Sequence, residues 1–398
     1  MIAAITGIGI VSPIGCGREA FWRALIDGQS GVALAEAPLT AAGLPTRAAA
    51  VREFTARDFI TSSHLRRMDR FSRLVVAASR MAVTDAQLPL DRLAAESIGV
   101  VVGSALGDIS ESMQHLERVF TRGPAAASPM MFPNLVLNAA ASYVAMEHGW
   151  TGVNLTVAQA EVSGEQAILV GADLLRSGQA EVVLAGGGDE IGRAVAEVCR
   201  RTGILAAQQG GDEWSSPYDV ARSGLVLGEG SAMLVLESYE RARARGATVY
   251  ALLDDAVAFA VPAPGYDWPQ RAEAALAPLR RLCGPAGVEL ICGGANSTPR
   301  LDDCEVDLFN RLAADGAWVT SIKGAVGEFG GAGALTAAAA CLALHTQTVP
   351  PLCSLRTPPQ VGRLRFPARA ERCAIERALA SGLARGGAGV GLLIRRAT

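Results

Sequence analysis

Short apolar runs bounded by glycine recur along the whole chain and constrain its fold more than any other feature. They occupy residues 2–11, 98–102, 182–185, 233–236, 288–291, 318–322 and 390–394. They are rich in β-branched residues and do not alternate strictly with polar ones, which is typical of strands buried on both faces of a sheet. Segments of helical period lie between them, at 70–86, 165–177 and 305–314. This alternation predicts an α/β fold with layered sheets.

No low-complexity linker divides the chain into independent domains. The least patterned stretch, residues 261–268, is rich in proline and glycine and follows the end of one α/β half near Tyr250. We therefore expect two halves, residues 1–250 and 251–398, packed as one unit. The second half holds three strong strand candidates with helices between them, which is consistent with an internal duplication, although the direct self-similarity is weak.

The charged residues exclude some classes of function and limit the chemistry of the rest. The 398 residues are 50% hydrophobic with a net charge of −3, which supports a large buried core and gives no sign of a nucleic-acid surface. Arginine supplies all the basic side chains except one, Lys323. The histidines are His64, His115, His148 and His345. A mechanism that needs imidazole or ammonium groups therefore has very few candidates.

The eight cysteines have no C-x-x-C spacing and so predict neither a zinc site nor a redox pair. We expect them to be buried in a protein of a reducing compartment. The first residues lack the pattern of a signal peptide, and no apolar stretch approaches the roughly 18 residues of a membrane span. A soluble cytoplasmic protein without a membrane segment, metal or cofactor is therefore expected.

Residues 156–164 form a short apolar approach and a small-residue turn before a helix predicted to begin near Glu165. Such a turn presents a side chain, commonly a nucleophilic cysteine or serine, at a helix N-terminus that stabilises negative charge. The residue at the apex here is Glu161. Local sequence alone explains it equally well as an ordinary capping or first-turn preference.

Five further motifs are spread along the chain. They are ITGIGIVSPIG at 5–15, RMDRFS at 67–72, PYD at 217–219 with Arg222, GEG at 228–230 and LVLE at 234–237. In this order they resemble the β-ketoacyl synthases of the thiolase-like superfamily, and the similarity continues to Gly386 and Gly387 near the C-terminus. The resemblance covers essentially the whole chain. It implies a thiolase-like layered αβαβα fold built from two similar halves.

Synthases of this family use an acylated cysteine, two histidines that assist decarboxylation of the malonyl extender, and a lysine. By similarity of the surrounding motifs, Glu161 stands at the cysteine position, Gly294 at the first histidine and Glu328 at the second. None of the four histidines lies within either motif, so no small shift in register restores one. The resemblance therefore implies that this chain has no catalytic residues of the synthase type.

Two basic residues also fall at positions that matter in the family. Lys323, the only lysine, stands at the family's lysine position, and we expect it to form an ionic cluster with Glu161 and Glu328 in the vacated site. Arg385 replaces the aromatic residue that gates the acyl channel of the family, although a solvated loop arginine would look the same in the sequence.

A synthase-like chain without its catalytic set resembles the chain-length factors of type II polyketide systems. The resemblance implies a non-catalytic subunit that forms a heterodimer with an active β-ketoacyl synthase, shapes its acyl tunnel, and meets an acyl carrier protein through the complex. Residues 131–141 resemble a family stretch at the dimer interface, which is consistent with pairing. Glutamate at position 161 leaves both an aromatic polyketide and a polyene pathway, such as that of an aryl polyene, open.

The alternative is a malonyl-carrier-protein decarboxylase that uses Glu161 in place of the cysteine. Decarboxylation needs donors to the developing enolate, and neither Gly294 nor Glu328 supplies one. A hydrolase or acyltransferase with another nucleophile has less support, because the chain has no G-x-S-x-G motif. We therefore do not expect the isolated chain to be an enzyme.

Overall fold

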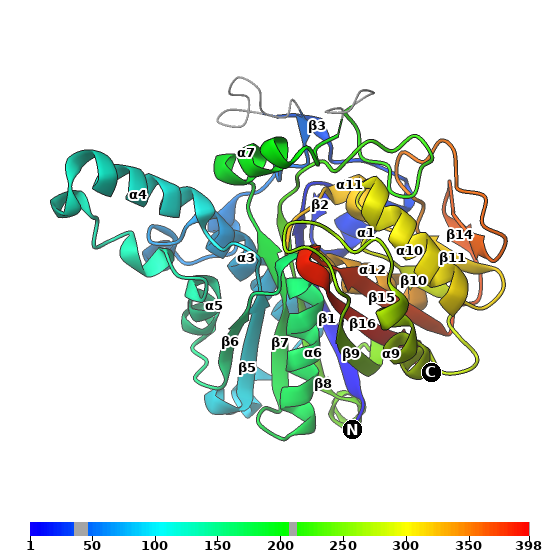
Figure 1. Ribbon diagram of the computed structural model, residues 1–398. Helices are drawn as coiled ribbons and strands as arrows, with labels where there is room; N and C mark the ends of the chain where they lie inside the picture. The colour runs from blue at the N-terminus through cyan, green and yellow to red at the C-terminus, as the bar shows by residue number, and fades with distance from the viewer. Residues whose placement is uncertain (36–46, 207–212, 398) are drawn as a thin grey trace.

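The computed structural model describes residues 1–35, 47–206 and 213–397. One large sheet runs through the molecule and is enclosed by helices (Figure 1). Its strands are β1 (Ala3–Ser12), β2 (Gly15–Cys16), β5 (Ile98–Gly103), β6 (Asn154–Val157), β7 (Val182–Asp189), β8 (Gly230–Ser238), β9 (Ala251–Ala260), β10 (Leu290–Cys292), β11 (Ala317–Thr320), β13 (Leu364–Arg365), β15 (Arg377–Leu383) and β16 (Ala388–Arg395).

The helices and the short strands outside this sheet complete the fold. The main helices are α1 (Arg18–Ile26), α3 (Arg70–Ala86), α4 (Ile109–Arg122), α5 (Ala139–His148), α6 (Ser163–Arg176), α7 (Arg193–Thr202), α8 (Tyr239–Ala244), α9 (Glu273–Cys283), α10 (Pro299–Leu312), α11 (Lys323–Val326) and α12 (Ala332–Thr346). Two small antiparallel pairs lie apart from the main sheet: β3 (Ala33–Leu34) with β4 (Arg47–Ala48), and β12 (Thr348–Val349) with β14 (Glu371–Arg372).

The strand order shows one topology twice. Within residues 3–238 the order is β1-β8-β7-β5-β6, and within residues 251–395 it is β9-β16-β15-β10-β11. Each set has two antiparallel pairings followed by two parallel ones. The sets join where residues 3–5 of β1 pair with residues 251–253 of β9. The predicted α/β fold of two similar halves is confirmed, and the division at residue 250 stays a prediction.

Helices form three layers around the two halves of the sheet (Figure 1). α3 packs on β1 and β8 with α5 beside it, and α9 packs on β9 and β16 with α10 beside it. α6 and α12 lie between the halves and contact each other. They approach so closely that a Cβ on Gly164 would lie 2.5 Å from Ala334 N. This central contact places the N-terminus of α6 beside the loop that precedes α12.

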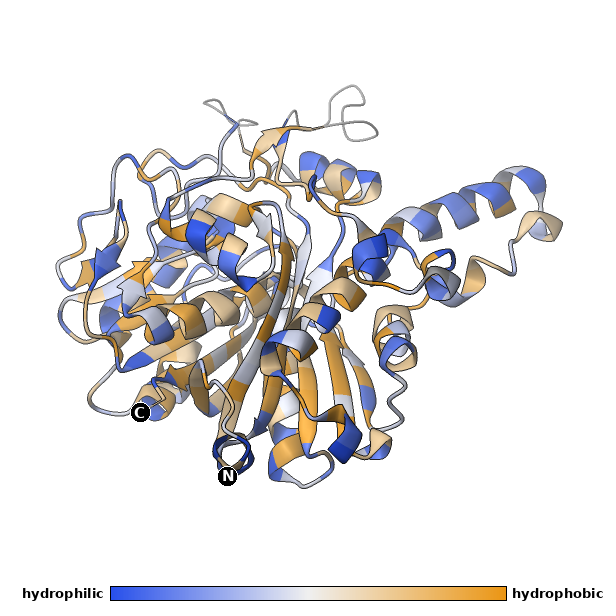
Figure 2. Ribbon diagram, turned by 180° about the vertical axis from the view of Figure 1, so that it is seen from behind, coloured by the Kyte–Doolittle hydropathy of each residue, from blue (hydrophilic) through white to orange (hydrophobic). Residues whose placement is uncertain are grey.

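One element leaves this layered body. Residues 108–138, which we call the arm, comprise α4 and the loop after it and project from the first half (Figure 1). Figure 2 shows apolar residues concentrated on the strands, whereas most of α4 is hydrophilic. No residue of α4 is buried, so the tertiary structure of this chain does not cover its apolar stripe.

Exposed apolar side chains nevertheless gather around the arm. Phe120 is 83% exposed and Met130 is 78% exposed. Others lie close by in the sequence, directly before the arm, on the arm, on α5 and on β6: Leu106, Met113, Leu116, Phe132, Val136, Leu137, Met146 and Leu155. β6 ends the strand order, so its outer edge has no partner strand within the described residues. We call this region, residues 106–157, the arm face.

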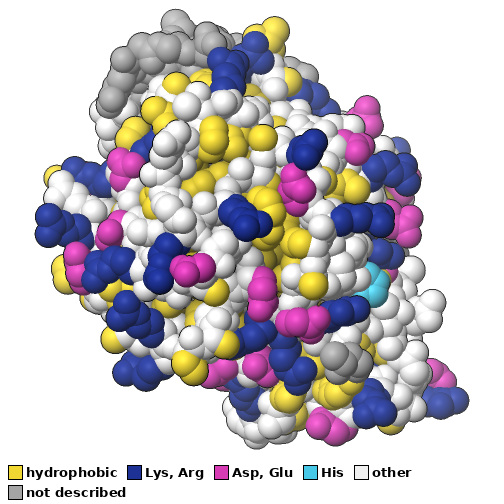
Figure 3. All heavy atoms as spheres, turned by 90° about the vertical axis from the view of Figure 1, so that its right-hand side faces the viewer, with side chains coloured by type: hydrophobic (Ala, Val, Ile, Leu, Met, Phe, Trp, Pro, Cys, Tyr) yellow, Lys and Arg dark blue, Asp and Glu magenta, His cyan; other side chains and the backbone are white. Residues whose placement is uncertain are grey.

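The surface of the second half carries charged side chains, and the cysteines, all among the described residues, form no disulfide bond. The side of the molecule drawn in Figure 3 carries arginines interspersed with acidic residues. Arg363 forms an exposed ion pair with Asp315. All eight cysteines are free thiols; six are buried, and Cys16 and Cys373 are partly exposed. Among the described residues, no helix is both long and apolar enough to cross a membrane.

Candidate functional site

Glu161 lies in a tight turn between β6 and α6. Ala160, directly before it, has a φ of 50°, in the left-handed region that residues with a side chain rarely adopt. Ser163 holds the turn, because its hydroxyl accepts a hydrogen bond from Gln159 N (2.9 Å) and donates one to Ala160 O (2.7 Å). The turn presents Glu161 at the N-terminus of α6 in the interior, where it is 6% exposed. Strained backbone of this kind is common at functional sites.

Arg385 closes over Glu161. Its Nε donates to Glu161 Oε1 at 2.6 Å, and its backbone N–H donates to Oε2 at 3.0 Å. Its guanidinium also lies 5.4 Å from the ring centre of Trp268, a distance that permits a cation–π interaction. The side chain of Arg385 is therefore held against Glu161 and is not that of a solvated loop arginine.

Lys323 pairs with Glu328. Lys323 Nζ donates to Glu328 Oε2 at 2.8 Å, and both side chains are buried. Burial by itself lowers the pKa of Lys323, but the carboxylates of Glu328, Glu165 and Glu305 outweigh it and raise that pKa above its usual value. We expected one cluster of Lys323 with both Glu161 and Glu328. The structure corrects this, because Glu161 makes its ion pair with Arg385.

Gly294 lies in the loop between β10 and α10. Its N–H donates to Glu305 Oε1, and the N–H of Ala295 donates to Glu305 Oε2, both at 2.9 Å. A Cβ on Gly294 would lie 3.1 Å from Glu305 Oε1, so this carboxyl occupies the space beside the glycine. Two residues further on, Asn296 Nδ2 donates to Glu328 Oε2 at 2.5 Å. The loop thereby joins the positions of Gly294 and Glu328 in one network.

Two buried carboxyls in this network were not expected from the sequence. Burial raises the pKa of Glu165 and that of Glu305 to about 7 each. Tyr218 donates its hydroxyl to Glu305 at 2.7 Å, whereas Glu165 Oε2 has no hydrogen-bond partner among the described residues. Glu305 could have been found, because it falls on the buried face of α10 with Leu301 and Leu308. Glu165 gave no such signal, since acidic residues are common in the first turn of a helix.

Little space remains between these groups. A hollow of about 50 Å³ lies among Glu161, Glu328 and Arg385, with Cys199 of α7 also in its wall. This volume holds a few water molecules but no acyl chain. We call Glu161, Lys323, Glu328 and Arg385, with this hollow, the filled site.

The filled site offers little chemistry of its own. Burial raises the pKa of Cys199 to about 11, so this thiol is not a thiolate near neutral pH. None of the four histidines lines the hollow. In the part of the chain that the structure describes, no three histidine, cysteine or acidic side chains are placed to hold a metal ion. The charges of the filled site neutralise one another in pairs.

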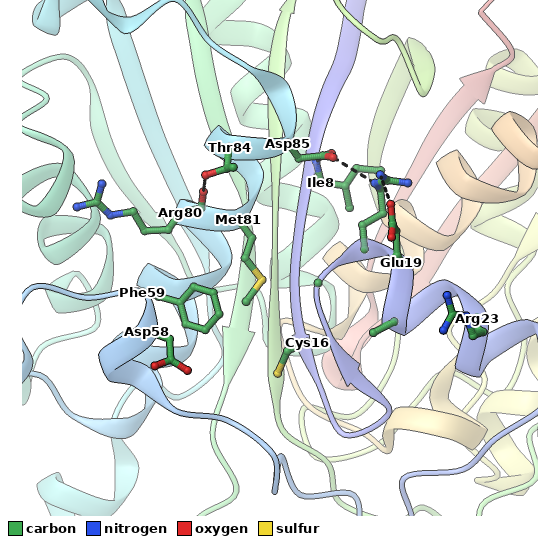
Figure 4. Close-up of a pocket in the computed structure, with 13 residues that line it drawn as sticks. Ile8, Cys16, Glu19, Arg23, Asp58, Phe59, Arg80, Met81, Thr84 and Asp85 are labelled. Atoms are coloured by element: carbon green, nitrogen blue, oxygen red, sulfur yellow. Dashed lines mark hydrogen bonds and ion pairs between the residues drawn. The ribbon is translucent and has the colours of Figure 1, made fainter.

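A wider pocket of about 770 Å³ opens at the surface elsewhere, between α1 and α3 (Figure 4). Arg18 Nε donates there to Asp85 at 3.2 Å, and the Arg18 guanidinium lies 5.0 Å from the ring centre of Tyr250. No residue lines both this pocket and the hollow. Arg18 is paired with Glu19 and Asp85, and Arg80 is paired with Glu147, and we assign this pocket no function.

The structure thus defines a duplicated α/β protein whose two central helices adjoin a buried, charge-filled site. The family models "Beta-ketoacyl synthase, N-terminal domain" and "Beta-ketoacyl synthase, C-terminal domain" match residues 3–242 and 254–356. The chain belongs to the β-ketoacyl synthase family.

Individual relatives match over nearly their whole length. The 3-oxoacyl-[acyl-carrier-protein] synthase 2 of Rhizobium meliloti is 31% identical over 424 residues, covering 99% of this chain and 98% of the relative. The protein of the same name from Synechocystis sp. is 29% identical over 411 residues, covering 98% and 97%. A solved structure, the ishigamide ketosynthase/chain length factor, is similar with a TM-score of 0.91 and 26% identity, over 100% of this chain and 99% of that chain.

Removing the positive charge of Lys323 from its ion pair with Glu328 is expected to reduce the stability of the protein strongly. The variant Lys323→Met leaves the buried Glu328 carboxylate without its ion-pair partner, which we expect to lower the free energy of unfolding by about 3–5 kcal/mol. Calorimetric melting at pH 8 measures this. Arg363→Met, which removes the exposed partner of Asp315, is the control and should change stability by less than about 0.5 kcal/mol. Equal melting of Lys323→Met and the wild type would contradict a stabilising role for the pair.

Substitution of Glu165 is expected to increase the stability of the protein in a pH-dependent way. Its pKa is raised on folding, so the folded protein binds a proton that the unfolded chain has lost, and stability falls as pH rises from about 4 to about 7. Glutamine mimics the protonated form. We expect Glu165→Gln to melt like the wild type at pH 5 and to be more stable by about 3 kcal/mol at pH 8. A variant that is less stable at both pH values would show that an ionised Glu165 supports the fold.

Proposed function

We propose that this chain is a non-catalytic subunit of the chain-length-factor type, which pairs with an active β-ketoacyl synthase and completes its acyl tunnel. The observation that carries the proposal is the filled site. Arg385 pairs with Glu161, Lys323 pairs with Glu328, and about 50 Å³ is left between them. Condensation needs a thiolate and donors that face the thioester oxygen. The filled site presents two neutralised ion pairs at the matching positions.

The arm face supports the presence of a partner. Phe120, Met130 and Phe132 expose large apolar side chains to solvent, and β6 has no partner strand on its outer edge within the described residues. Exposed large apolar side chains and an open strand edge are both features that soluble proteins commonly cover with a partner. Permanent pairs of subunits bury roughly 2,000–5,000 Å² in interfaces of this kind. We assign the arm face to the active synthase.

A groove beneath the arm supports a role in the tunnel. It has a volume of about 1190 Å³ and lies between α4, α7 and residues 48–52. Ile109, Met113, Leu116 and Phe120 follow one another at about one helical turn along α4 and form its apolar wall. Glu190 and Ile191 line both the groove and the hollow, so the groove begins beside the filled site. With the partner in place, this wall would limit the length of the chain that the partner extends.

The names of the relatives are consistent with both members of such a pair. The two curated relatives are named as synthases, and the ishigamide structure is named as a ketosynthase/chain length factor. The filled site favours the second role for this chain. The pair would act in the cytoplasm on chains bound to an acyl carrier protein, in an aromatic polyketide or a polyene system.

Co-expression with the synthase encoded beside it tests the proposal. We expect a 1:1 complex on co-purification and synthase activity only when both chains are present. Leu155→Asp places a charge on the exposed part of β6 and should reduce recovery of the complex at least about tenfold. Val220→Asp, at another exposed apolar residue outside the arm face, is the matched control and should leave recovery unchanged.

Two outcomes would count against this assignment. One is failure of the wild-type chains to associate. The other is decarboxylation of malonyl-carrier protein by the pure chain alone, lost in Glu161→Ala, which would favour the priming decarboxylase.

The groove predicts a shift in product length. Leu116→Trp adds volume to the apolar wall, so the complex that is recovered should release shorter chains, by at least one extension unit. Leu116 also belongs to the arm face, so product length is compared for equal amounts of purified complex. Mass spectrometry of the released products measures this. Val220→Trp, which introduces the same side chain outside the groove, is the control. An unchanged distribution with Leu116→Trp would mean that the groove does not bound the chain.

A further inference from the structure

Two loops meet near Glu161 and are fastened to each other. The 3-10 turn at Arg385–Gly387 follows β15, and the N–H of Gly386 donates to Pro264 O (3.2 Å) and to Asp267 O (3.1 Å). Val261 N donates in turn to Gly387 O at 2.7 Å. Residues 261–268 are the stretch that showed least pattern in the sequence. Their backbone therefore fixes the turn that carries Arg385.

Arg385 lies between Glu161 and the solvent. Its side chain is 29% exposed, whereas that of Glu161 is 6% exposed. Both carboxylate oxygens of Glu161 accept from Arg385, one from the side chain and one from the backbone N–H. Trp268, fully buried, supports the guanidinium from the other side. Of the residues in the 385–387 turn, Arg385 alone lines the hollow.

We propose that Glu161, Arg385 and Trp268 form a latch that keeps thioester-bound acyl chains out of the filled site of this subunit, so that their thioester reacts only in the site of the partner. The inference rests on the proposed function and adds to it a means of excluding substrate. An apolar chain that entered here would separate an ion pair and leave the buried Glu161 carboxylate without its partner, which is strongly unfavourable. An aromatic side chain at position 385 would carry no such penalty for moving aside.

Cys199 is a native reporter of the latch. It lines the hollow beneath Arg385 and is 3% exposed. The positive charge of Arg385 lowers the pKa of this thiol, although burial dominates and raises it overall. Loss of Arg385 would therefore make Cys199 less acidic and, by that effect alone, slower to react. Faster alkylation after removal of Arg385 can only come from better access.

The experiment compares alkylation of the full-length chain by iodoacetamide, followed by peptide mass spectrometry, in the wild type and in Arg385→Ala. We expect Cys199 to react about tenfold faster or more in the variant, because the charge-assisted hydrogen bonds that hold the latch are lost. Cys292 and Cys341, which are fully buried, should stay protected and so report an intact fold. Arg363→Ala, at an exposed ion pair, should leave all three rates unchanged.

Two results would overturn the latch. Equal alkylation of Cys199 in the wild type and in Arg385→Ala would show that Arg385 does not close the hollow. Equal acceleration of Cys199, Cys292 and Cys341 would show that Arg385 only stabilises the fold. Co-purification of the same chains with the synthase is measured in a separate experiment. If the wild-type chain fails to pair with the synthase, the proposed function is rejected, whereas the latch is still judged by the alkylation rates.

Discussion

The close approach of α6 and α12 is the contact on which the rest of the architecture depends. It joins two halves of equal topology through small side chains, with Gly164 against the backbone at Ala334. Residues 332–344 of α12 are all buried, as expected of a helix enclosed by protein on every side. Because the helices meet here, the turn at Ala160–Val162 and the loop carrying Glu328 are brought to one place, although they are far apart in the sequence.

The interior near this contact carries more negative than positive charge. Glu161, Glu165, Glu305 and Glu328 are balanced only by Lys323 and Arg385. The structure resolves the excess by two means: two carboxylates bind the two cations, and burial raises the pKa of Glu165 and Glu305 toward neutrality. The charges of the site are therefore balanced against one another. The strained turn at Ala160 presents one of them, Glu161, at its apex.

Much of the fold could be predicted from the sequence, because buried strands and amphipathic helices leave periodic patterns. The helix predicted at 70–86 has those bounds in the structure, and the run at 98–102 lies within β5. The run at 318–322 ended differently, since Ser321 and Ile322 already lead into α11. The pairing of Glu161 with Arg385 spans 224 residues and could not be predicted, because no local pattern records which of many arginines reaches a buried carboxylate.

The paired charges of the filled site also bear on how its positions can be exchanged during evolution. A substitution that removes the carboxylate at 161 would leave Arg385 without its ion-pair partner, and one at 328 would leave the buried Lys323 without a carboxylate. Because removing one partner of a buried pair is strongly unfavourable, the paired positions change most readily together. A side chain added at Gly294 would also meet Glu305. We therefore expect this site to vary by coupled substitutions, whereas exposed positions vary one at a time.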